Sequence, residues 1–421
     1  MKAEIIAAGS ELLTPDRVDT NSLFLTAELN KLGIEVTRKA IVGDNRGDIR
    51  DAFAQALARA DVVIATGGLG PTEDDLTREA VAELLGRKLE SNPAVLRTIQ
   101  ERFRSIGRQM ADVNARQAMV PEGAQVLENL RGTAPGLWLE SEGRIIILLP
   151  GPPKEMEALF SRQVAERLAT RAGGTRLVER DLRVAGMTES DLDQLIAPIY
   201  TKYPDVHTTI LAAPGEIQVQ PRIWAADVRA AEKLLDEMVE RFTIALGDNL
   251  FTVKGESLEE VVADALIQNH ATISTAESCT GGLVAERLTR IPGSSSYFLG
   301  GVVSYSNELK SAWADVPPEL IQSRGAVSAE VAIALAEGIR LRTGSTLGMG
   351  ITGIAGPGGG TSEKPVGLVH IALAGGGAPR ERGLRFPGDR ERVRWQASQV
   401  ALDMVRRHFL YVPGKRPGTK G

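Results

Sequence analysis

The chain has 421 residues, a length that suits two or three domains, each with its own hydrophobic core. Its 49 basic and 54 acidic side chains give a formal net charge of −5, which argues against binding nucleic acid or an anionic membrane through bulk positive charge. The one cysteine, Cys279, excludes an intramolecular disulfide and any multi-cysteine metal site.

Residues 1–172 alternate short apolar runs with helical patterns. We expect four strands here, at Glu4–Ala8, Ile34–Val42, Asp61–Thr66 and Arg144–Leu149. We expect three helices between and after them, at Asn21–Leu32, Ile49–Arg59 and Pro153–Arg171. Short connections between such elements predict a parallel sheet with right-handed crossovers. The segment AGGT at Ala172–Thr175 is the first break in composition.

Residues 173–253 predict a small α+β domain. Its expected elements are a strand at Arg176–Ala185, a helix at Glu189–Ile199, strands at Thr208–Ala212 and Glu216–Trp224, and a helix at Ala226–Phe242. The pattern is similar to a KH module but has no G-x-x-G loop, so we interpret it as a spacer or dimerisation domain and do not expect it to bind RNA.

Residues 254–412 are Gly-rich and again of α/β character. Expected helices are Leu258–Asn269, Gly282–Arg290, Ser328–Thr343 and Arg390–Leu410, and expected strands are Thr272–Thr275, Gly301–Tyr305, Thr346–Ile351 and Val366–Leu373. Residues 413–421 resemble a disordered tail. The predicted fold class is therefore α/β, with a small α+β domain between two larger domains.

One candidate site lies where predicted N-terminal strands end. The segment TGGLGPTEDD (Thr66–Asp75) follows a buried strand, and its glycines let the backbone approach a ligand and donate N–H groups to phosphate oxygens. Asp74 and Asp75 follow, where one carboxylate can cap a helix and another can bind a divalent metal. Glu11 and Asp44 also follow strands. The alternative is a tight Gly-rich turn followed by a helix cap.

A second candidate site centres on TAESCTGG (Thr275–Gly282), which follows a strand and begins a helix. This places Ser278, Cys279 and Thr280 at the positive end of the helix, a geometry that suits a phosphate or an oxyanion. The alternative is that Ser278 or Thr280 only caps the helix.

The four histidines lie outside these motifs, so a Ser-His-Asp triad is not expected. A serine nucleophile would then need another base, and Lys310, which ends the segment GVVSYSNELK, is the candidate; its alternative is an exposed helix lysine. Cys279 is a rival nucleophile because a helix N-terminus also activates a thiolate, although a small buried cysteine is the commoner case.

The N-terminal motifs resemble those of the CinA family: TGGLGPTEDD, DTNS at Asp19–Ser22, VGDN at Val42–Asn45, RGTAPG at Arg131–Gly136 and LPGPPKEM at Leu149–Met156. The resemblance implies a molybdopterin-binding-like, three-layer α/β domain that hydrolyses ADP-ribose to AMP and ribose 5-phosphate. It implies a divalent metal (Mg²⁺, Mn²⁺ or Co²⁺) on Asp74 and Asp75, with a monovalent cation as a possible addition. The implied substrate residues are Glu11, Asn21, Asp44, Thr66, Gly67, Gly68, Gly70, Pro71 and Thr133, with Pro150–Pro153 as pocket wall.

Five C-terminal segments also resemble the CinA family: TAESCTGG, GSSS at Gly293–Ser296, GVVSYSNELK, TGIAGPGGG with KPVG, and FPGDR at Phe386–Arg390. The resemblance implies a metal-free nicotinamide mononucleotide deamidase with no cofactor at this site. It implies Ser278 as nucleophile and Lys310 as base, with Tyr305 and Thr352 orienting the acyl intermediate. The implied substrate contacts are Thr280, Gly281, Ser295, Gly356, Gly358 and Arg390.

Together these features predict a bifunctional hydrolase of pyridine-nucleotide recycling. Its expected ligands are nicotinamide mononucleotide and ADP-ribose, and a homodimer is expected. No signal-peptide pattern or apolar run of roughly 18 residues is present, so we expect a cytoplasmic protein with no membrane contact. The alternative is a protein that binds a pterin or nucleotide without turnover and acts beside competence and recombination machinery; direct nucleic-acid binding is not expected.

Overall fold

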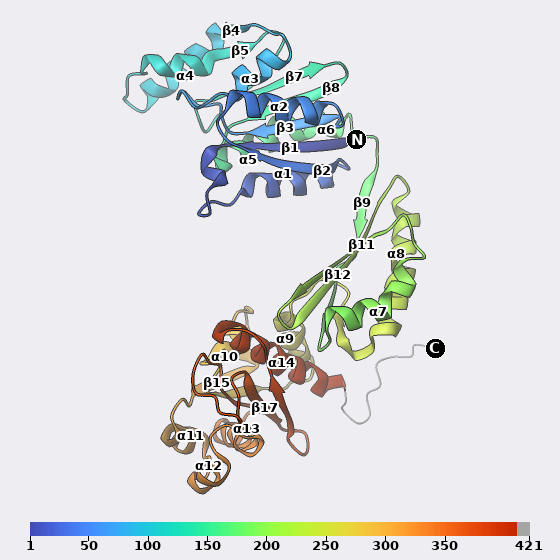
Figure 1. The fold of residues 1–421 in the computed structure, drawn as a ribbon, viewed down its shortest axis with the longest axis vertical. Helices are drawn as coiled ribbons and strands as arrows, with labels where there is room; N and C mark the ends of the chain where they lie inside the picture. The colour runs from blue at the N-terminus through green and yellow to red at the C-terminus, as the bar shows by residue number, and fades with distance from the viewer. Residues whose placement is uncertain (411–421) are drawn as a thin grey trace. The chain divides into compact units, whose positions relative to one another are not determined.

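The computed structural model describes residues 1–410, which divide into two compact units of mixed α/β structure (Figure 1). The first unit comprises Met1–Val178 and Trp224–Ala231, and the second comprises Glu179–Ile223 and the described residues from Glu232 onward. The segment 413–421, predicted to be disordered, lies outside the described residues. Within residues 1–410, no helix combines the length and apolar character needed to cross a bilayer.

The first unit contains a six-stranded sheet with the order β2-β1-β3-β8-β7-β6 and a separate β4-β5 pair. Its strands are β1 (Lys2–Ala8), β2 (Glu35–Val42), β3 (Val62–Thr66), β4 (Leu89–Ser91), β5 (Met119–Pro121), β6 (Gln125–Leu127), β7 (Gly136–Ser141) and β8 (Arg144–Leu149). Its helices are α1 (Thr20–Lys31), α2 (Arg46–Leu57), α3 (Thr77–Leu84), α4 (Pro93–Ser105), α5 (Pro153–Leu159) and α6 (Ala165–Ala169), with a π-helical turn at Phe160–Val164 and 3₁₀ turns η1 (Ser10–Leu13) and η2 (Asp112–Ala118).

The parallel arrangement is correct for the four predicted strands, β2, β1, β3 and β8, but the sheet continues into two strands that were not predicted. β7 pairs antiparallel with β8 and β6 pairs antiparallel with β7, so β7 alone runs against the other strands of the sheet. Only two residues, Glu142 and Gly143, separate β7 from β8, so these strands pair as a hairpin.

Helices cover both faces of this sheet, which is why the central strands β1, β3 and β8 are apolar at most positions (Figure 1). On one face, Ile5 and Ile64 pack against Leu25 of α1 and Met156 of α5. On the other face, Ile6, Val63 and Ile146 pack against α2 and α3. The result is a three-layer domain whose central strands end together at one edge.

The middle part of the chain forms a small antiparallel sheet with helices, most of which belong to the second unit. Its elements are β9 (Arg176–Glu179), β10 (Leu182–Ala185), α7 (Glu189–Tyr200), β11 (His207–Ala213), β12 (Glu216–Ala225), α8 (Val228–Leu246), η4 (Gly247–Asn249) and β13 (Leu250–Thr252). The single strand predicted at Arg176–Ala185 is wrong. The strand is interrupted at residues 180–181, and the second part, β10, pairs with β12 and β13.

The C-terminal part contains a five-stranded sheet with the order β15-β14-β16-β17-β18. Its strands are β14 (Ile273–Glu277), β15 (Phe298–Val303), β16 (Leu347–Gly353), β17 (Leu368–Ala374) and β18 (Arg380–Arg385). Its helices are α9 (Leu258–Gln268), α10 (Leu283–Thr289), α11 (Asn307–Ala314), α12 (Pro318–Arg324), α13 (Ala329–Thr343) and α14 (Arg390–Leu410), with the 3₁₀ turn η5 (Ser294–Ser296). β15, β14 and β16 are parallel, so TAESCTGG and the segments after β15 and β16 begin at the same edge.

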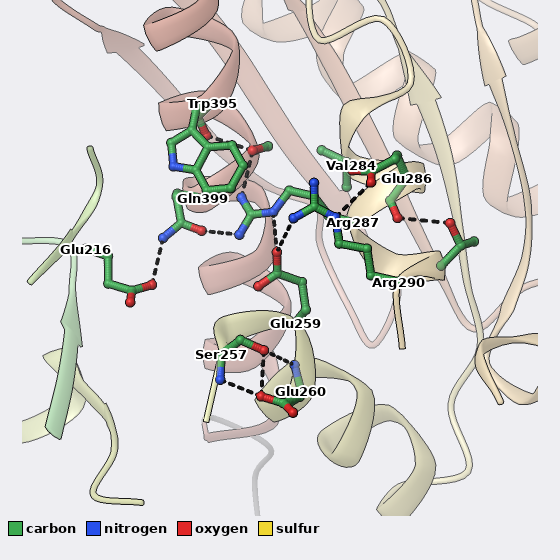
Figure 2. A network of polar contacts seen from close by, with 12 residues as sticks. Glu216, Ser257, Glu259, Glu260, Val284, Glu286, Arg287, Arg290, Trp395 and Gln399 are labelled. Carbon is green, nitrogen blue, oxygen red and sulfur yellow. Dashed lines mark hydrogen bonds and ion pairs between the residues drawn. The ribbon is translucent and has the colours of Figure 1, made fainter. Parts of the chain in front are cut away.

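A buried arginine joins three helices of this domain (Figure 2). Arg287 of α10 is 1% exposed; its Nε donates to Glu259 of α9 at 2.7 Å, and its other nitrogens donate to Ser398 and Gln399 of α14. The guanidinium also lies 4.3 Å from the ring centre of Trp395. These contacts satisfy a cation that burial would otherwise destabilise strongly.

Replacing Glu259 with glutamine should destabilise the protein, because Arg287 would stay buried with its charge unpaired. We expect a loss of about 3–5 kcal/mol in the free energy of unfolding at neutral pH, measured by urea denaturation. Burial alone would raise the pKa of Glu259, but the hydrogen bond and charge of Arg287 outweigh it and hold that pKa below 4.5. The advantage of the wild type should therefore be complete above pH 4.5 and disappear as the pH falls through the lowered pKa. Glu337→Gln, on the exposed side of α13, is the control and should change little; equal stability of both variants would contradict the importance of the pair.

Candidate active sites

In the first unit, a cavity of about 670 Å³ opens where β1, β3 and β8 end. The sequence-predicted residues that line it are Glu11, Asn21, Asp44, Thr66, Gly67, Gly68, Gly70, Asp74, Asp75 and Thr133, together with Pro150–Pro153. Pro71 does not belong to the lining residues. Glu11, Asp44 and the segment Thr66–Asp75, each of which follows a different strand, therefore meet in one cavity.

The loop Gly67–Gly70 is held by several contacts, one of which is the hydrogen bond from the N–H of Gly67 to the carbonyl of Leu149 at 3.0 Å. Gly67 and Gly68 have positive φ, and a Cβ on Gly67 would lie 2.0 Å from the carbonyl oxygen of Ala8. Arg78, almost fully buried in α3, donates to the carbonyls of Leu69 (2.7 Å) and Gly70 (3.2 Å). Within residues 1–410, the N–H groups of Gly68, Leu69 and Gly70 have no acceptor, which suits a ligand rich in phosphate oxygens.

The charge of the cavity suits a bound cation. Six carboxylates line it, against one arginine, Arg17: Glu11, Asp19, Asp44, Asp74, Asp75 and Glu155. Several already accept hydrogen bonds, as Asp75 does from the N–H and hydroxyl of Thr72 and Asp44 from the N–H of Ser10. No three His, Cys, Asp or Glu side chains in the described part of the chain are grouped closely enough to hold a metal by themselves. A cation here would thus need water or ligand oxygens as well, which is the usual way in which Mg²⁺ is bound.

In the C-terminal domain, Ser278 and Lys310 are in direct contact. Lys310 Nζ lies 3.2 Å from Ser278 Oγ, and it also donates to the carbonyls of Ser304 (2.9 Å) and Tyr305 (3.5 Å). Ser278 is 8% exposed and Lys310 is 2% exposed. Lys310 belongs to α11, a helix that the sequence analysis did not predict and that Ser306 caps by accepting from the N–H of Leu309.

Burial lowers the pKa of Lys310, and the charge of nearby Glu308 only partly opposes this effect. A neutral amine at this position can accept the proton of Ser278 while it continues to donate to Ser304. The reading of Lys310 as an exposed helix lysine is therefore wrong, and the pair has the geometry of a nucleophile and its base.

The positive end of α10 is already occupied by a side chain of the protein. Glu277 is fully buried, and its carboxylate accepts from the N–H groups of Gly282 (3.0 Å), Val284 (3.1 Å) and Ala285 (2.8 Å). Glu277 is therefore the anion at these three donors, whereas the N–H groups of Ser278, Cys279 and Thr280, for which the sequence predicts an anionic partner, do not donate to it. Its effect is to fix the turn that carries Ser278.

Cys279 does not share the position of Ser278. Its side chain packs in the core with Leu288, Ile351 and Val393, and burial raises the pKa of its thiol to about 12. A thiol that stays protonated at neutral pH is a poor nucleophile, so the geometry favours Ser278 over Cys279.

The remaining predicted residues of this site differ in burial and in their hydrogen bonds. Arg390 joins two of them, because its guanidinium donates to the hydroxyl of Tyr305 at 2.6 Å and to the carbonyl of Gly356 at 2.9 Å. Thr352 is buried and donates its hydroxyl proton to the carbonyl of Ala326 at 2.7 Å. The others are Thr280, which is fully buried, and Gly281, Ser295 and Gly358, which are exposed.

Three residues that shape these sites were not among the predictions: Arg78, Glu277 and Arg394. Arg394 lies one turn after Arg390 in α14, and its Nε and Nη2 donate to the carbonyl of Thr280 at 3.1 and 2.8 Å. Each of the three binds backbone groups rather than a recognisable partner side chain. The one sequence signal was position, since Glu277 lies within TAESCTGG, Arg78 follows TGGLGPTEDD by three residues and Arg394 follows Arg390 at i+4.

Sequence models of three families match successive parts of the chain. They describe a probable molybdopterin binding domain over residues 4–170, a damage-inducible protein CinA KH domain over 179–252 and a CinA C-terminal domain over 255–409. These matches confirm the predicted fold class, including the KH-like middle domain.

Full-length relatives and a solved structure are also similar to the chain. A CinA-like protein from Koribacter versatilis is 52% identical and covers 97% of this chain and all of its own length. A CinA-like protein from Solibacter usitatus is 51% identical, covering 97% of this chain and 98% of its own length. A crystal structure of a CinA protein from Thermoplasma acidophilum is 36% identical, covers 40% of this chain and 97% of its own, and has a TM-score of 0.37.

The environment of Cys279 predicts that the folded protein resists thiol alkylation. At about pH 8, iodoacetamide should leave the native chain unmodified, because the thiol is buried and remains protonated. The same reagent should add one equivalent after unfolding in guanidinium chloride, since the chain has one cysteine. Mass spectrometry of the intact protein measures the extent of alkylation in the native and the unfolded samples. Rapid stoichiometric labelling of the native protein would return Cys279 to consideration as the nucleophile.

Proposed function

The chain belongs to the CinA family, and from this premise we propose that it is a bifunctional hydrolase of pyridine-nucleotide recycling. At the Ser278 site it hydrolyses nicotinamide mononucleotide to nicotinate mononucleotide and ammonia. At the cavity of the N-terminal domain it cleaves ADP-ribose to AMP and ribose 5-phosphate. The observation that carries the proposal is the buried contact between Lys310 Nζ and Ser278 Oγ.

In the amidase reaction, Ser278 Oγ attacks the carbonyl carbon of the nicotinamide amide while its proton passes to neutral Lys310. The tetrahedral intermediate collapses with cleavage of the C–N bond, and Lys310 returns the proton to the nitrogen, which leaves as ammonia. Water then attacks the acyl-serine, so the carboxylate is released and Ser278 regains its proton. No group beyond the protein and water is needed to balance these steps.

The surroundings of the pair support this assignment. Ser278 and Lys310 are each attached to the backbone at a strand end: the N–H of Ser278 donates to Ile351 at 2.9 Å, and Ser304, whose carbonyl binds Lys310, donates its N–H to the carbonyl of Glu277 at 2.8 Å. Both catalytic side chains are therefore positioned by the sheet itself. Arg390, with Tyr305 and the Gly356 loop, supplies cationic and hydroxyl groups suited to the phosphoribosyl part of the substrate.

In the pyrophosphatase reaction, the free N–H groups of Gly68, Leu69 and Gly70 would bind the diphosphate oxygens. A divalent ion on Asp74 and Asp75, completed by water and phosphate oxygens, would neutralise negative charge on the diphosphate and polarise its phosphorus centres. Addition of water across one P–O bond of the diphosphate gives AMP and ribose 5-phosphate. The surplus of carboxylates around the cavity supports such an ion.

Ser278→Ala and Lys310→Ala should each lower the kcat of ammonia release from nicotinamide mononucleotide by at least about 10³-fold, with the double variant little worse. Lys310→Arg should not restore activity, because a guanidinium stays protonated. Cys279→Ala should keep most of the activity. Activity of Ser278→Ala alongside inactivity of Cys279→Ala would contradict the assignment.

The rate of the wild-type amidase should rise with pH, because only neutral Lys310 can accept the serine proton. Since burial lowers the pKa of Lys310, the midpoint of the rise should lie below 10.5, the ordinary value for lysine. A pH–rate profile of kcat/KM measures this midpoint. A rate that is flat from about pH 6 to 10 would argue against a lysine base.

Asp75→Asn should abolish metal-dependent cleavage of ADP-ribose and leave amide hydrolysis nearly unchanged. Asparagine still offers Thr72 an oxygen acceptor, so the variant removes the charge and preserves the turn. Glu73→Gln, in the same loop but outside the cavity lining, is the matched control and should behave as wild type. Chromatography of AMP and an ammonia assay on one sample, with and without chelator, separate the activities; equal loss of both on chelation would contradict two independent sites.

A further inference from the structure

The last helix of the described chain contacts the Ser278 site through two arginines. Arg390 and Arg394 are four residues apart in α14, so their side chains extend from the same face of the helix. Arg390 contacts Tyr305 and Gly356, whereas Arg394 contacts Thr280. Two side chains from one helix thus reach three separate segments around Ser278.

Arg394 binds the turn that carries the nucleophile. Its Nε and Nη2 both donate to the carbonyl oxygen of Thr280, two residues after Ser278. Gly281 and Gly282 follow with φ of +62° and +89°, so this turn is built from residues with unusual conformational freedom. A planar guanidinium that spans one oxygen with two N–H groups restricts such a turn more than a single hydrogen bond would.

Other contacts fix the turn on its remaining sides. The N–H of Ser278 donates to the carbonyl of Ile351 in β16, and the carboxylate of Glu277 accepts from three N–H groups beyond Gly281. The carbonyl of Thr280 lies between these two anchors, and besides Arg394 it accepts from the N–H of Leu283 at 3.3 Å. Arg394 is therefore the side chain that sets the middle of the turn.

We propose that Arg394 is a positioning residue of the amidase site, which holds the Ser278 turn at the distance from Lys310 that proton transfer requires. This inference rests on the proposed function of Ser278 and extends it to a residue outside the motifs. Arg394 acts through Thr280 and not on the substrate. Its loss should therefore lower kcat while KM stays nearly constant, because ground-state binding is left intact.

The experiment compares full-length Arg394→Lys, Arg394→Gln and Arg392→Gln proteins with the wild type. Arg392 lies on the exposed side of the same helix and is the matched control. Three measurements are made: the melting temperature, the rate at which a fluorophosphonate probe labels Ser278, and kcat and KM for ammonia release from nicotinamide mononucleotide.

Both Arg394 variants should remain folded, with labelling rate and kcat lowered by at least about tenfold and KM changed by less than about threefold. Lysine should not rescue, since it cannot form the two-nitrogen contact. Unchanged labelling and kcat in both variants would overturn the proposal, as would a decrease no larger than the loss of folded protein or an equal decrease in Arg392→Gln.

The labelling assay separates this inference from the proposed substrate. A wild type that reacts with the probe at Ser278 but releases no ammonia would disprove the amidase assignment. The labelling rates of the Arg394 variants would still decide the role of Arg394 in that case.

Discussion

The burial of the Lys310 amine is the constraint on which the C-terminal domain depends. A lysine that is 2% exposed must either find enough acceptors to stay charged or give up its proton readily. Here two backbone carbonyls and one hydroxyl surround Nζ, so the protonated form is tolerated and the neutral form is accessible. The strand ends, the Ser306 cap and the Glu277 carboxylate all serve to keep this amine and the Ser278 hydroxyl in contact.

The two candidate sites use opposite electrostatic arrangements. Around Ser278 the reactive groups are dry and carry little free charge, which suits chemistry that requires a neutral amine. The cavity of the N-terminal domain is open and rich in carboxylates, and its lining includes Gly68, Leu69 and Gly70, whose N–H groups have no acceptor within residues 1–410. This is the arrangement on which the proposed metal-dependent cleavage of a diphosphate depends. Each domain therefore suits a reaction that the other would perform poorly.

The sequence predicted the elements with strong periodicity and missed those held by tertiary contacts. Buried strands such as β3 and β8 were predicted because helices on both faces make every position apolar. α11 was missed although it carries Lys310, since its eight residues show little apolar pattern and its stability comes from the Ser306 cap and the packing of Ala314. β7 was missed because it returns to β8 through a two-residue hairpin, which departs from the alternation of strands and helices seen in the rest of this domain. Among site residues, motif positions such as Asp75 and Ser278 were found, whereas Arg78, Glu277 and Arg394 were not. Their partners are backbone groups, and because every residue has these groups, a single sequence does not show which of them a side chain will contact.

Side chains along most of helix α14 form hydrogen bonds with other segments of the chain. Arg394 contacts the Ser278 turn, and Ser398 binds Arg287. Gln399 also binds Arg287 and donates to Glu216 of β12 at 3.2 Å (Figure 2). Farther along, Arg406 donates to the backbone carbonyl of Asp248. A single inserted or deleted residue between these positions would turn the following part of the helix by about 100° and move its partners out of reach. These contacts imply that α14 tolerates substitutions better than insertions or deletions, so we expect length variation among relatives to fall in the loops and not within this helix.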